Sequence, residues 1–179
     1  MTRPRTKPPR GFTLIEMLTT VAVLIIVLGL MVSLARYVRN ELAIEVTKDL
    51  LHRLDAALQQ YMVRHDNQVP QVPPFIPLNM PADVLPDEQV LQQNAAANNR
   101  GIVLALRQEG LLRDASFGGL PETIFDDMMV RDAWGSPIAF MPAMHEGIGM
   151  ALQNRPFFFS AGPDQKYLTQ ENNLYSYEK

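Results

Sequence analysis

The feature that most constrains this chain is a long uncharged segment near its N-terminus. No Asp, Glu, Lys or Arg occurs among the 19 residues Met17–Ala35, which lie between Glu16 and Arg36. A helix needs about 20 mostly apolar residues to cross the hydrocarbon core of a bilayer, so this segment is long enough to span one. An unpaired carboxylate in a membrane helix costs about 2.5–3.5 kcal/mol at the bilayer centre and less near the interface. We therefore expect Glu16 to have a partner.

The residues before this segment are basic. Residues 1–10 contain four basic residues, three prolines and no acid, and Gly11 follows them. Basic residues beside a membrane span remain on the cytoplasmic side. We therefore predict an unstructured cytoplasmic leader, a single membrane span, and a remainder of the chain on the opposite side of the membrane.

The stretch Gly11-Phe12-Thr13-Leu14-Ile15-Glu16, between the basic leader and the apolar segment, resembles the class III signal of type IV pilins and of the pseudopilins of type II secretion. The resemblance implies that a prepilin peptidase removes residues 1–11 by cutting between Gly11 and Phe12, and that the new amine of Phe12 is methylated. It also implies that Glu16 pairs with the N-terminal amine of a neighbouring subunit during filament assembly. In hydrocarbon, such an ion pair offsets the desolvation of both charges.

Two other interpretations of the N-terminal region remain open. An ordinary secretory signal peptide would use the small residues of Ser33-Leu34-Ala35 for cleavage. Its apolar region is usually only 7–15 residues long, however, and Glu16 would be unfavourable at its start. A plain single-span anchor explains the length of the segment but gives Glu16 no role.

The N-terminal helix is expected to continue beyond the apolar segment, because no proline occurs between Phe12 and Arg64. Two lines of mostly apolar residues recur with heptad spacing: Ile44, Leu51 and Leu58, and Thr47, Leu54 and Tyr61. The pattern predicts one helix from about Phe12 to His65, with an apolar part at 12–36 and an amphipathic part at 37–66. The second part needs a head to cover one of its faces. The alternative is an amphipathic linker helix.

Residues 67–179 are predicted to form the globular head. Residues 70–86 contain six prolines, which are incompatible with a regular helix, so an extended loop is expected there. Residues 87–112 are predicted to form two helical pieces, with Asp87 as a cap, the second piece starting near Asn98 or Asn99, and Gly110 at its end. Residues 114–130 are predicted to be a loop with at most one helical turn.

The C-terminal third favours a small antiparallel sheet. Apolar runs bounded by turn residues predict strands at Ile138–Met141 and Phe157–Ser160, and a last extended piece at Leu174–Tyr177. Trp134, in the turn before the first strand, is expected to bury its ring in the head. The predicted fold class is therefore α+β and pilin-like: a long N-terminal helix packed on a small antiparallel sheet, with extra helices and a Pro-rich loop.

The tail contains Asp132, Trp134, Gly135 and Pro137 before the first strand and Gly162-Pro163-Asp164 after a later one. With these residues it resembles the major pseudopilin of type II secretion, in which such a Gly-x-Asp loop often binds calcium. The resemblance implies a calcium site at Asp164 with Glu171 or Asn172. Asn172 and Asn173 stand where an aspartate is common, and calcium takes six to eight oxygen ligands whose carboxylates set its affinity. The alternative is that Asp164 and Asn172 bond the backbone of their own turns.

We find no pattern typical of an enzyme in the sequence. His52, His65 and His145 are the three histidines, and they do not have the spacing of a zinc protease; no G-x-S-x-G and no phosphate-binding glycine loop occurs. The Asp126-Asp127 pair is interpreted as a solvated turn. The chain has no cysteine, and without residues 1–11 it has 12 basic and 19 acidic residues, which argues against nucleic-acid binding. We expect a non-enzyme without catalytic residues.

The resemblance therefore implies a pseudopilin that assembles into a helical periplasmic filament of type II secretion. Its partners would be a prepilin peptidase, an inner-membrane platform protein, an assembly ATPase and minor pseudopilins. A type IV pilus or competence pilin is the first alternative. A membrane-anchored periplasmic binding or enzymatic domain is the second.

Overall fold

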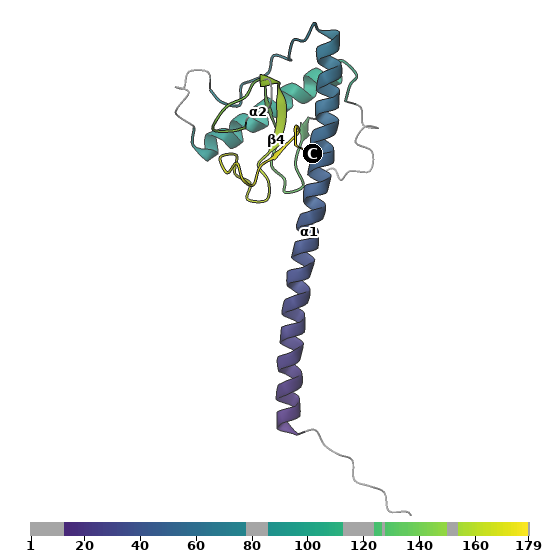
Figure 1. Ribbon diagram of the computed structural model, residues 1–179, viewed down its shortest axis with the longest axis vertical. Coiled ribbons are helices and arrows are strands. Elements are labelled where there is room, and N and C mark those ends of the chain that lie inside the picture. Colours follow the sequence, from purple (N-terminus) through teal and green to yellow (C-terminus); the bar gives the residue numbers. More distant parts are fainter. Residues whose placement is uncertain (1–12, 78–85, 113–123, 127, 150–153, 179) are drawn as a thin grey trace, which may run out of the picture. The chain divides into compact units, whose positions relative to one another are not determined.

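The computed structural model describes residues 13–77, 86–112, 124–126, 128–149 and 154–178. It divides into two compact units, Met1–Arg39 and Asn40–Lys179, and each is considered by itself. The described elements form an α+β arrangement of two helices and short antiparallel strands (Figure 1).

Helix α1 extends over Leu14–Arg64, within two residues of the predicted helix at each end. The chain leaves it through Asp66 and Asn67, which both have positive φ, and the Asn67 N–H donates to the carbonyl of Met62. The buried residues of α1 all follow residue 46: Thr47, Leu50, Leu51, Leu54, Ala57 and Leu58. Four of these six are residues of the predicted heptad lines. Leu50 and Ala57 widen the buried stripe, while Ile44 and Tyr61 are half-buried.

Helix α2 is continuous over Glu88–Gln108, so the prediction of two helical pieces was wrong. Asn98 and Asn99 do not start a second helix. Both are 1% exposed and bond outward to segments remote in the sequence. Asp87 does occupy the N-cap, but its side chain makes no capping hydrogen bond. Gly110 has φ of 69° and ends the helix as predicted, with the Leu111 N–H donating to the Leu106 carbonyl.

The asparagines of α2 join the helix to the strands. The Nδ2 of Asn99 donates to the carbonyls of Val130 (2.9 Å) and Ile138 (2.5 Å), and its Oδ1 accepts from the Val130 N–H (2.9 Å). The Nδ2 of Asn98 donates to the Pro73 carbonyl, and its Oδ1 accepts from the Phe140 N–H. These buried amides therefore bond backbone groups in and next to the strands and in the Pro-rich stretch, as buried polar groups require.

The strands form two antiparallel groups. Strands β1 (Phe125–Asp126) and β2 (Met129–Val130) pair as a short hairpin, so the loop predicted for 114–130 contains strands that we did not expect. Strands β3 (Ala139–Met141), β4 (Phe157–Ser160) and β5 (Leu174–Tyr175) make a sheet in the order β3-β4-β5. The predicted hairpin and final extended piece are confirmed.

The central strand β4 is buried on both faces because its side chains alternate between two apolar clusters. Phe158 belongs to the cluster that contains the buried leucines of α1 and Leu106 of α2. Phe157 and Phe159 belong to a second cluster with Phe75 and Tyr167. Phe75 comes from the described part of the Pro-rich stretch, residues 70–77, which is non-helical as predicted.

Trp134 does not bury its ring as expected. It is half-buried and belongs to neither apolar cluster. The buried member of this turn is Asp132, which is 1% exposed. Its Oδ1 accepts from the N–H groups of Trp134 and Ser136, and its Oδ2 accepts from the Ser160 hydroxyl at 2.7 Å. The carboxylate therefore organises this turn and ties it to the end of β4.

Candidate functional site

The candidate site lies at the start of α1, where Thr13 and Glu16 form a reciprocal cap. The Oε2 of Glu16 accepts from the Thr13 N–H (3.1 Å) and from the Thr13 hydroxyl (3.0 Å). The Glu16 N–H in turn donates to the Thr13 Oγ1 (3.3 Å). The Met17 N–H donates to the Thr13 carbonyl, which makes Thr13 the N-cap and Glu16 the third helical residue. This is a capping box.

The cap places a carboxylate at the helix N-terminus, where the helix dipole favours negative charge. Gly11 and Phe12, the predicted cleavage and methylation residues, lie outside the described residues. Thr13 gives Glu16 hydrogen bonds within the chain, and the pairing of Glu16 with the amine of a neighbouring subunit stays a prediction. We did not predict this role for Thr13, although the Thr-x-x-Glu pattern that opens an apolar run was a readable signal.

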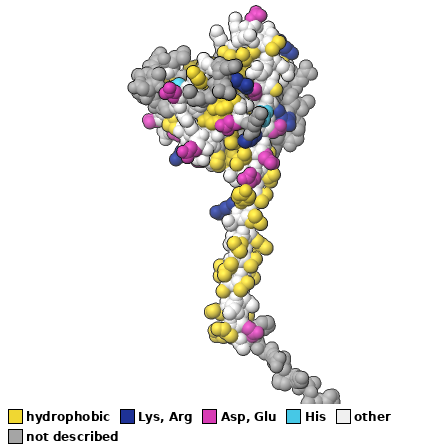
Figure 2. All heavy atoms as spheres, viewed as in Figure 1, with side chains coloured by type: hydrophobic (Ala, Val, Ile, Leu, Met, Phe, Trp, Pro, Cys, Tyr) yellow, Lys and Arg dark blue, Asp and Glu magenta, His cyan; other side chains and the backbone are white. Residues whose placement is uncertain are grey.

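The helix that follows the cap is apolar on every side. All residues from Thr13 to Arg39 are exposed, and hydrophobic side chains cover the visible face of this part of α1 (Figure 2). By length and composition α1 qualifies as a membrane span, and its most apolar window contributes nothing to the interior of the protein. Its apolar side chains therefore have no partners within the described chain.

Two threonines of this segment are bonded within the helix. The hydroxyl of Thr19 donates to the Glu16 carbonyl at 3.0 Å, and that of Thr20 donates to the Met17 carbonyl at 2.9 Å. Internal hydrogen bonds of this kind let a hydroxyl lie in an apolar medium at reduced cost.

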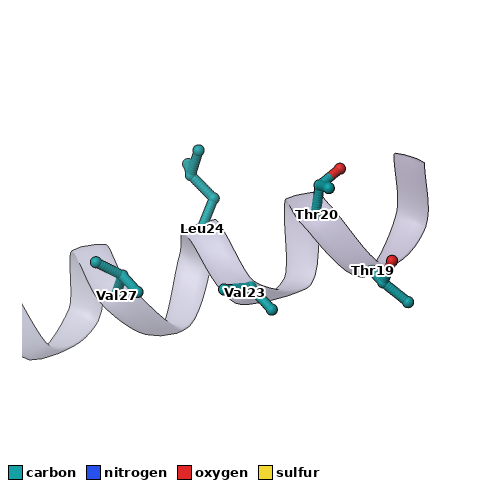
Figure 3. A pocket seen from close by; sticks show the side chains of 5 residues that line it. All are labelled: Thr19, Thr20, Val23, Leu24 and Val27. Carbon is teal, nitrogen blue, oxygen red and sulfur yellow. The ribbon is translucent and has the colours of Figure 1, made fainter. Parts of the chain in front are cut away.

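A shallow apolar groove follows one face of this helix. It is lined by Thr19, Thr20, Val23, Leu24 and Val27, which lie in two rows along the helix (Figure 3). Residues four apart form the ridges with which helices interdigitate when they pack. The groove is therefore a surface suited to a second apolar helix.

The predicted calcium residues lie on the loop between β4 and β5. The Oδ2 of Asp164 accepts from the Asn172 Nδ2 at 3.1 Å, and its Oδ1 accepts from the Lys166 N–H at 3.2 Å. Burial would raise the pKa of Asp164, but the hydrogen bonds from Asn172, Lys166 and Thr169 and the charge of Lys166 together outweigh it and lower the pKa. Glu171 is exposed.

The loop residues as arranged do not fit calcium. Asn172 presents its NH₂ group, not its oxygen, to Asp164, and both oxygens of that carboxylate accept from N–H donors. Among the described residues, no group of three or more His, Cys, Asp or Glu is placed to hold a metal ion. The contacts favour the alternative that these side chains satisfy their own turns, and calcium binding stays a prediction.

The structure also places the three histidines. His65 stacks on the ring of Tyr61, and its Nε2 lies 3.3 Å from the Oε1 of Glu109. The Nδ1 of His145 accepts from the Gly147 N–H inside a tight loop, and His52 is exposed on α1. Asp127, and the side chain of Asp126, lie outside the described residues. The His65–Glu109 pair joins the residues that follow α1 and α2, and the His145 contact is local to its loop.

One comparison with known protein families gives a match. The description "Prokaryotic N-terminal methylation motif" fits residues 7–32, which include Gly11, Phe12, Glu16 and most of the apolar segment. No curated protein and no solved structure matches the chain. The matched motif, the capped Glu16 and the exposed apolar helix together identify the N-terminal part of this chain as the signal of a type IV pilin-like protein that is processed as a prepilin.

Proposed function

We propose that this chain is a pseudopilin, a structural subunit that assembles into the periplasmic filament of a type II secretion system. The observation that carries the proposal is the methylation motif at residues 7–32, followed by a helix whose apolar surface is exposed on all sides. Burying one large apolar side chain contributes about 1.5–3 kcal/mol. A surface of this kind is stable only in lipid or against other apolar helices.

In the first stage the subunit is a single-pass protein of the inner membrane. The basic leader remains in the cytoplasm and the unit Asn40–Lys179 lies in the periplasm. The prepilin peptidase cuts between Gly11 and Phe12 and the amine of Phe12 is methylated.

In the second stage the apolar helices leave the lipid and pack against one another in the filament. The groove between the Thr19-Val23-Val27 row and the Thr20-Leu24 row accepts a ridge of a neighbouring helix. Glu16 pairs with the Phe12 amine of an adjacent subunit. A carboxylate accepts about four hydrogen bonds, so this pairing is compatible with the two that Thr13 donates.

Other proteins of the assembly machinery supply the energy for filament growth. An ATPase and an inner-membrane platform protein drive the growth of the filament, and minor pseudopilins share it. The chain itself acts as a structural subunit and not as an enzyme. A type IV pilus or competence pilin is the closest alternative, and the absence of cysteine favours the pseudopilin, because a C-terminal disulfide loop is typical of many pilins.

The test is intact-mass analysis of the membrane-extracted protein from cells that contain a prepilin peptidase. The mature chain should begin at a methylated Phe12, and Gly11→Val should keep residues 1–11. Gly29→Ala is the matched control, because a Cβ at Gly29 meets nothing within 4 Å, and this variant should be cut normally. A mature N-terminus after Ala35, or an unprocessed wild-type chain, would refute the proposal.

Filament capture then separates the two pilin-like alternatives. Cells that contain only the type II secretion machinery should incorporate the subunit into periplasmic filaments, and deletion of that machinery should abolish them. Incorporation only in cells with type IV pili would establish the alternative.

A further inference from the structure

We infer that the loop 161–173 is held in its folded form without a cation, by amide and hydroxyl donors inside the loop and by the carboxylate of Glu88 from helix α2. This inference does not depend on the proposed function. It starts from the disagreement between the calcium site that the sequence suggested and the donors that the structure places there.

The first observation is that N–H donors bind both oxygens of Asp164, the carboxylate that was expected to bind calcium. Asp164 is ionised at neutral pH, as an ordinary aspartate is, and the surrounding hydrogen bonds lower its pKa further. Its two oxygens accept from the Asn172 Nδ2 and the Lys166 N–H, and the Thr169 side chain adds a further bond. The NH₂ group of Asn172 thus supplies the positive end of a dipole where an aspartate would need a metal ion between the two carboxylates.

The second observation is that a carboxylate from outside the loop binds the loop backbone. Glu88 is the first residue of α2 and is half-buried. Its Oε1 accepts from the Tyr167 N–H at 2.7 Å, and its Oε2 accepts from the Leu168 N–H at 3.4 Å. The anion that these two N–H groups bind is the carboxylate of Glu88. This side of the loop is therefore held by hydrogen bonds to a side chain of α2, without a cation.

The third observation is that the loop closes on itself by direct contact. Gly162 has φ of 70°, and a Cβ there would overlap the carbonyl oxygen of Asn172. The Nδ2 of Asn173 donates to the Tyr167 carbonyl at 2.9 Å, and the Tyr167 hydroxyl donates to the Pro137 carbonyl at 2.6 Å. The two ends of the loop and its middle are therefore joined by protein atoms.

One oxygen in this region stands apart. The Oδ1 of Asn173 is buried and has no hydrogen-bond partner among the described residues. A single amide oxygen supplies one of the six to eight ligands that calcium takes. This one oxygen is not sufficient for a calcium site, because both oxygens of Asp164 already accept hydrogen bonds from N–H donors.

The inference is tested by thermal unfolding of the full-length protein, purified from membranes in detergent, in calcium chloride and in chelator. The wild-type midpoint should be the same in both. Asn172→Asp replaces the NH₂ group by a second carboxylate next to Asp164, so its midpoint should fall by several degrees in chelator and recover when calcium is added. A wild-type midpoint that drops in chelator, or an Asn172→Asp midpoint equal to the wild type in chelator, would overturn the inference.

Amide hydrogen exchange separates the positioning role of Glu88 from a general loss of stability. Glu88→Ala should increase exchange at least tenfold at the amides of Tyr167 and Leu168, equally in calcium and in chelator, while the amides of β3 and β4 remain protected. Glu171→Ala is the matched control from the same loop and should leave exchange unchanged. Unchanged exchange at Tyr167 in the Glu88 variant would show that Glu88 does not hold the loop.

Discussion

The two parts of helix α1 differ in where their apolar side chains find partners. From Thr13 to Arg39 every residue is exposed, whereas Leu50, Leu51 and Leu58 in the second part are 0% exposed. The first part is apolar on all sides and the second has one apolar stripe. The comparison teaches that a continuous helix can be stabilised by its own protein along one part and only by lipid or other subunits along the other.

The largest expected effect concerns the part whose partners lie outside the chain. Glu16→Leu should be cut at Gly11 but form no filaments, because the neighbouring amine loses its counter-charge in an apolar medium. Electron microscopy and shearing assays of the filaments would measure this.

Glu16→Gln separates the charge from the cap. A glutamine at this position can still bond the Thr13 N–H in a capping box, so the helix start is retained while the charge is lost. We expect this variant also to fail in assembly. Filaments at the wild-type level would show that Glu16 acts only as a cap.

The next prediction concerns the loss of stability when a leucine of α1 is truncated, which should be large in the head and small in the first part of the helix. Leu54 is 1% exposed and Leu24 is 59% exposed. Leu54→Ala should lower the free energy of unfolding by about 2–5 kcal/mol, whereas Leu24→Ala should change it by less than about 0.5 kcal/mol. Chemical unfolding of the full-length protein in detergent would measure both. Equal effects would contradict the division of α1 into two environments.

A third prediction asks whether polar contacts also stabilise the head. Asn99→Leu should lower the free energy of unfolding by at least about 2 kcal/mol, because the buried Val130 N–H and the Ile138 carbonyl lose their partner, and each such group costs about 1–3 kcal/mol. The same unfolding experiment measures it. Gln93→Leu, on the exposed face of α2, is the control and should have little effect.

The smallest effect is a pH dependence of the head. Burial raises the pKa of Asp132 above its ordinary value of 3.8, while hydrogen bonds from Ser160, Ser136 and Trp134 oppose the shift. The folded protein therefore keeps this proton to higher pH than the unfolded chain. Its contribution to stability is present below pH 3.8 and is lost as the pH rises through the folded pKa, by about 1.4 kcal/mol for each unit of pKa difference.

This effect is measured as the unfolding free energy from acidic to neutral pH, in the wild type and in Asp132→Asn. The decrease with rising pH should be smaller in the variant, because the asparagine does not titrate. An identical pH profile would show that Asp132 does not contribute to it.

Local patterns predicted the features that depend on neighbours in the sequence. The absence of proline and the apolar spacing predicted α1 to within two residues, and the Phe157–Ser160 run predicted β4 at its observed bounds. The leader, Gly11 and Glu16 predicted the signal that matches the methylation motif. The role of Thr13 was also local, and it was missed because the Thr-x-x-Glu pattern was not considered as a cap.

Contacts between distant segments decided the remaining features. Asn98 and Asn99 suggested a break between two helices, because free asparagines compete with helical hydrogen bonds. In the fold their amides bond instead to Pro73 and to the strands. Likewise, the large apolar ring of Trp134 suggested that this side chain would be buried. The buried side chain of this turn is instead Asp132, whose carboxylate accepts a hydrogen bond from the hydroxyl of Ser160, 28 residues away.

The sequence by itself determined that this chain has an N-terminal signal, a membrane-compatible helix and an amphipathic continuation, because charge, length and periodicity are properties of neighbouring residues. Only the tertiary structure decided which polar side chains are buried and what occupies the loop around Asp164. Those outcomes depend on which donors and acceptors from distant segments meet, and a buried polar group is stable only when such a partner is in place.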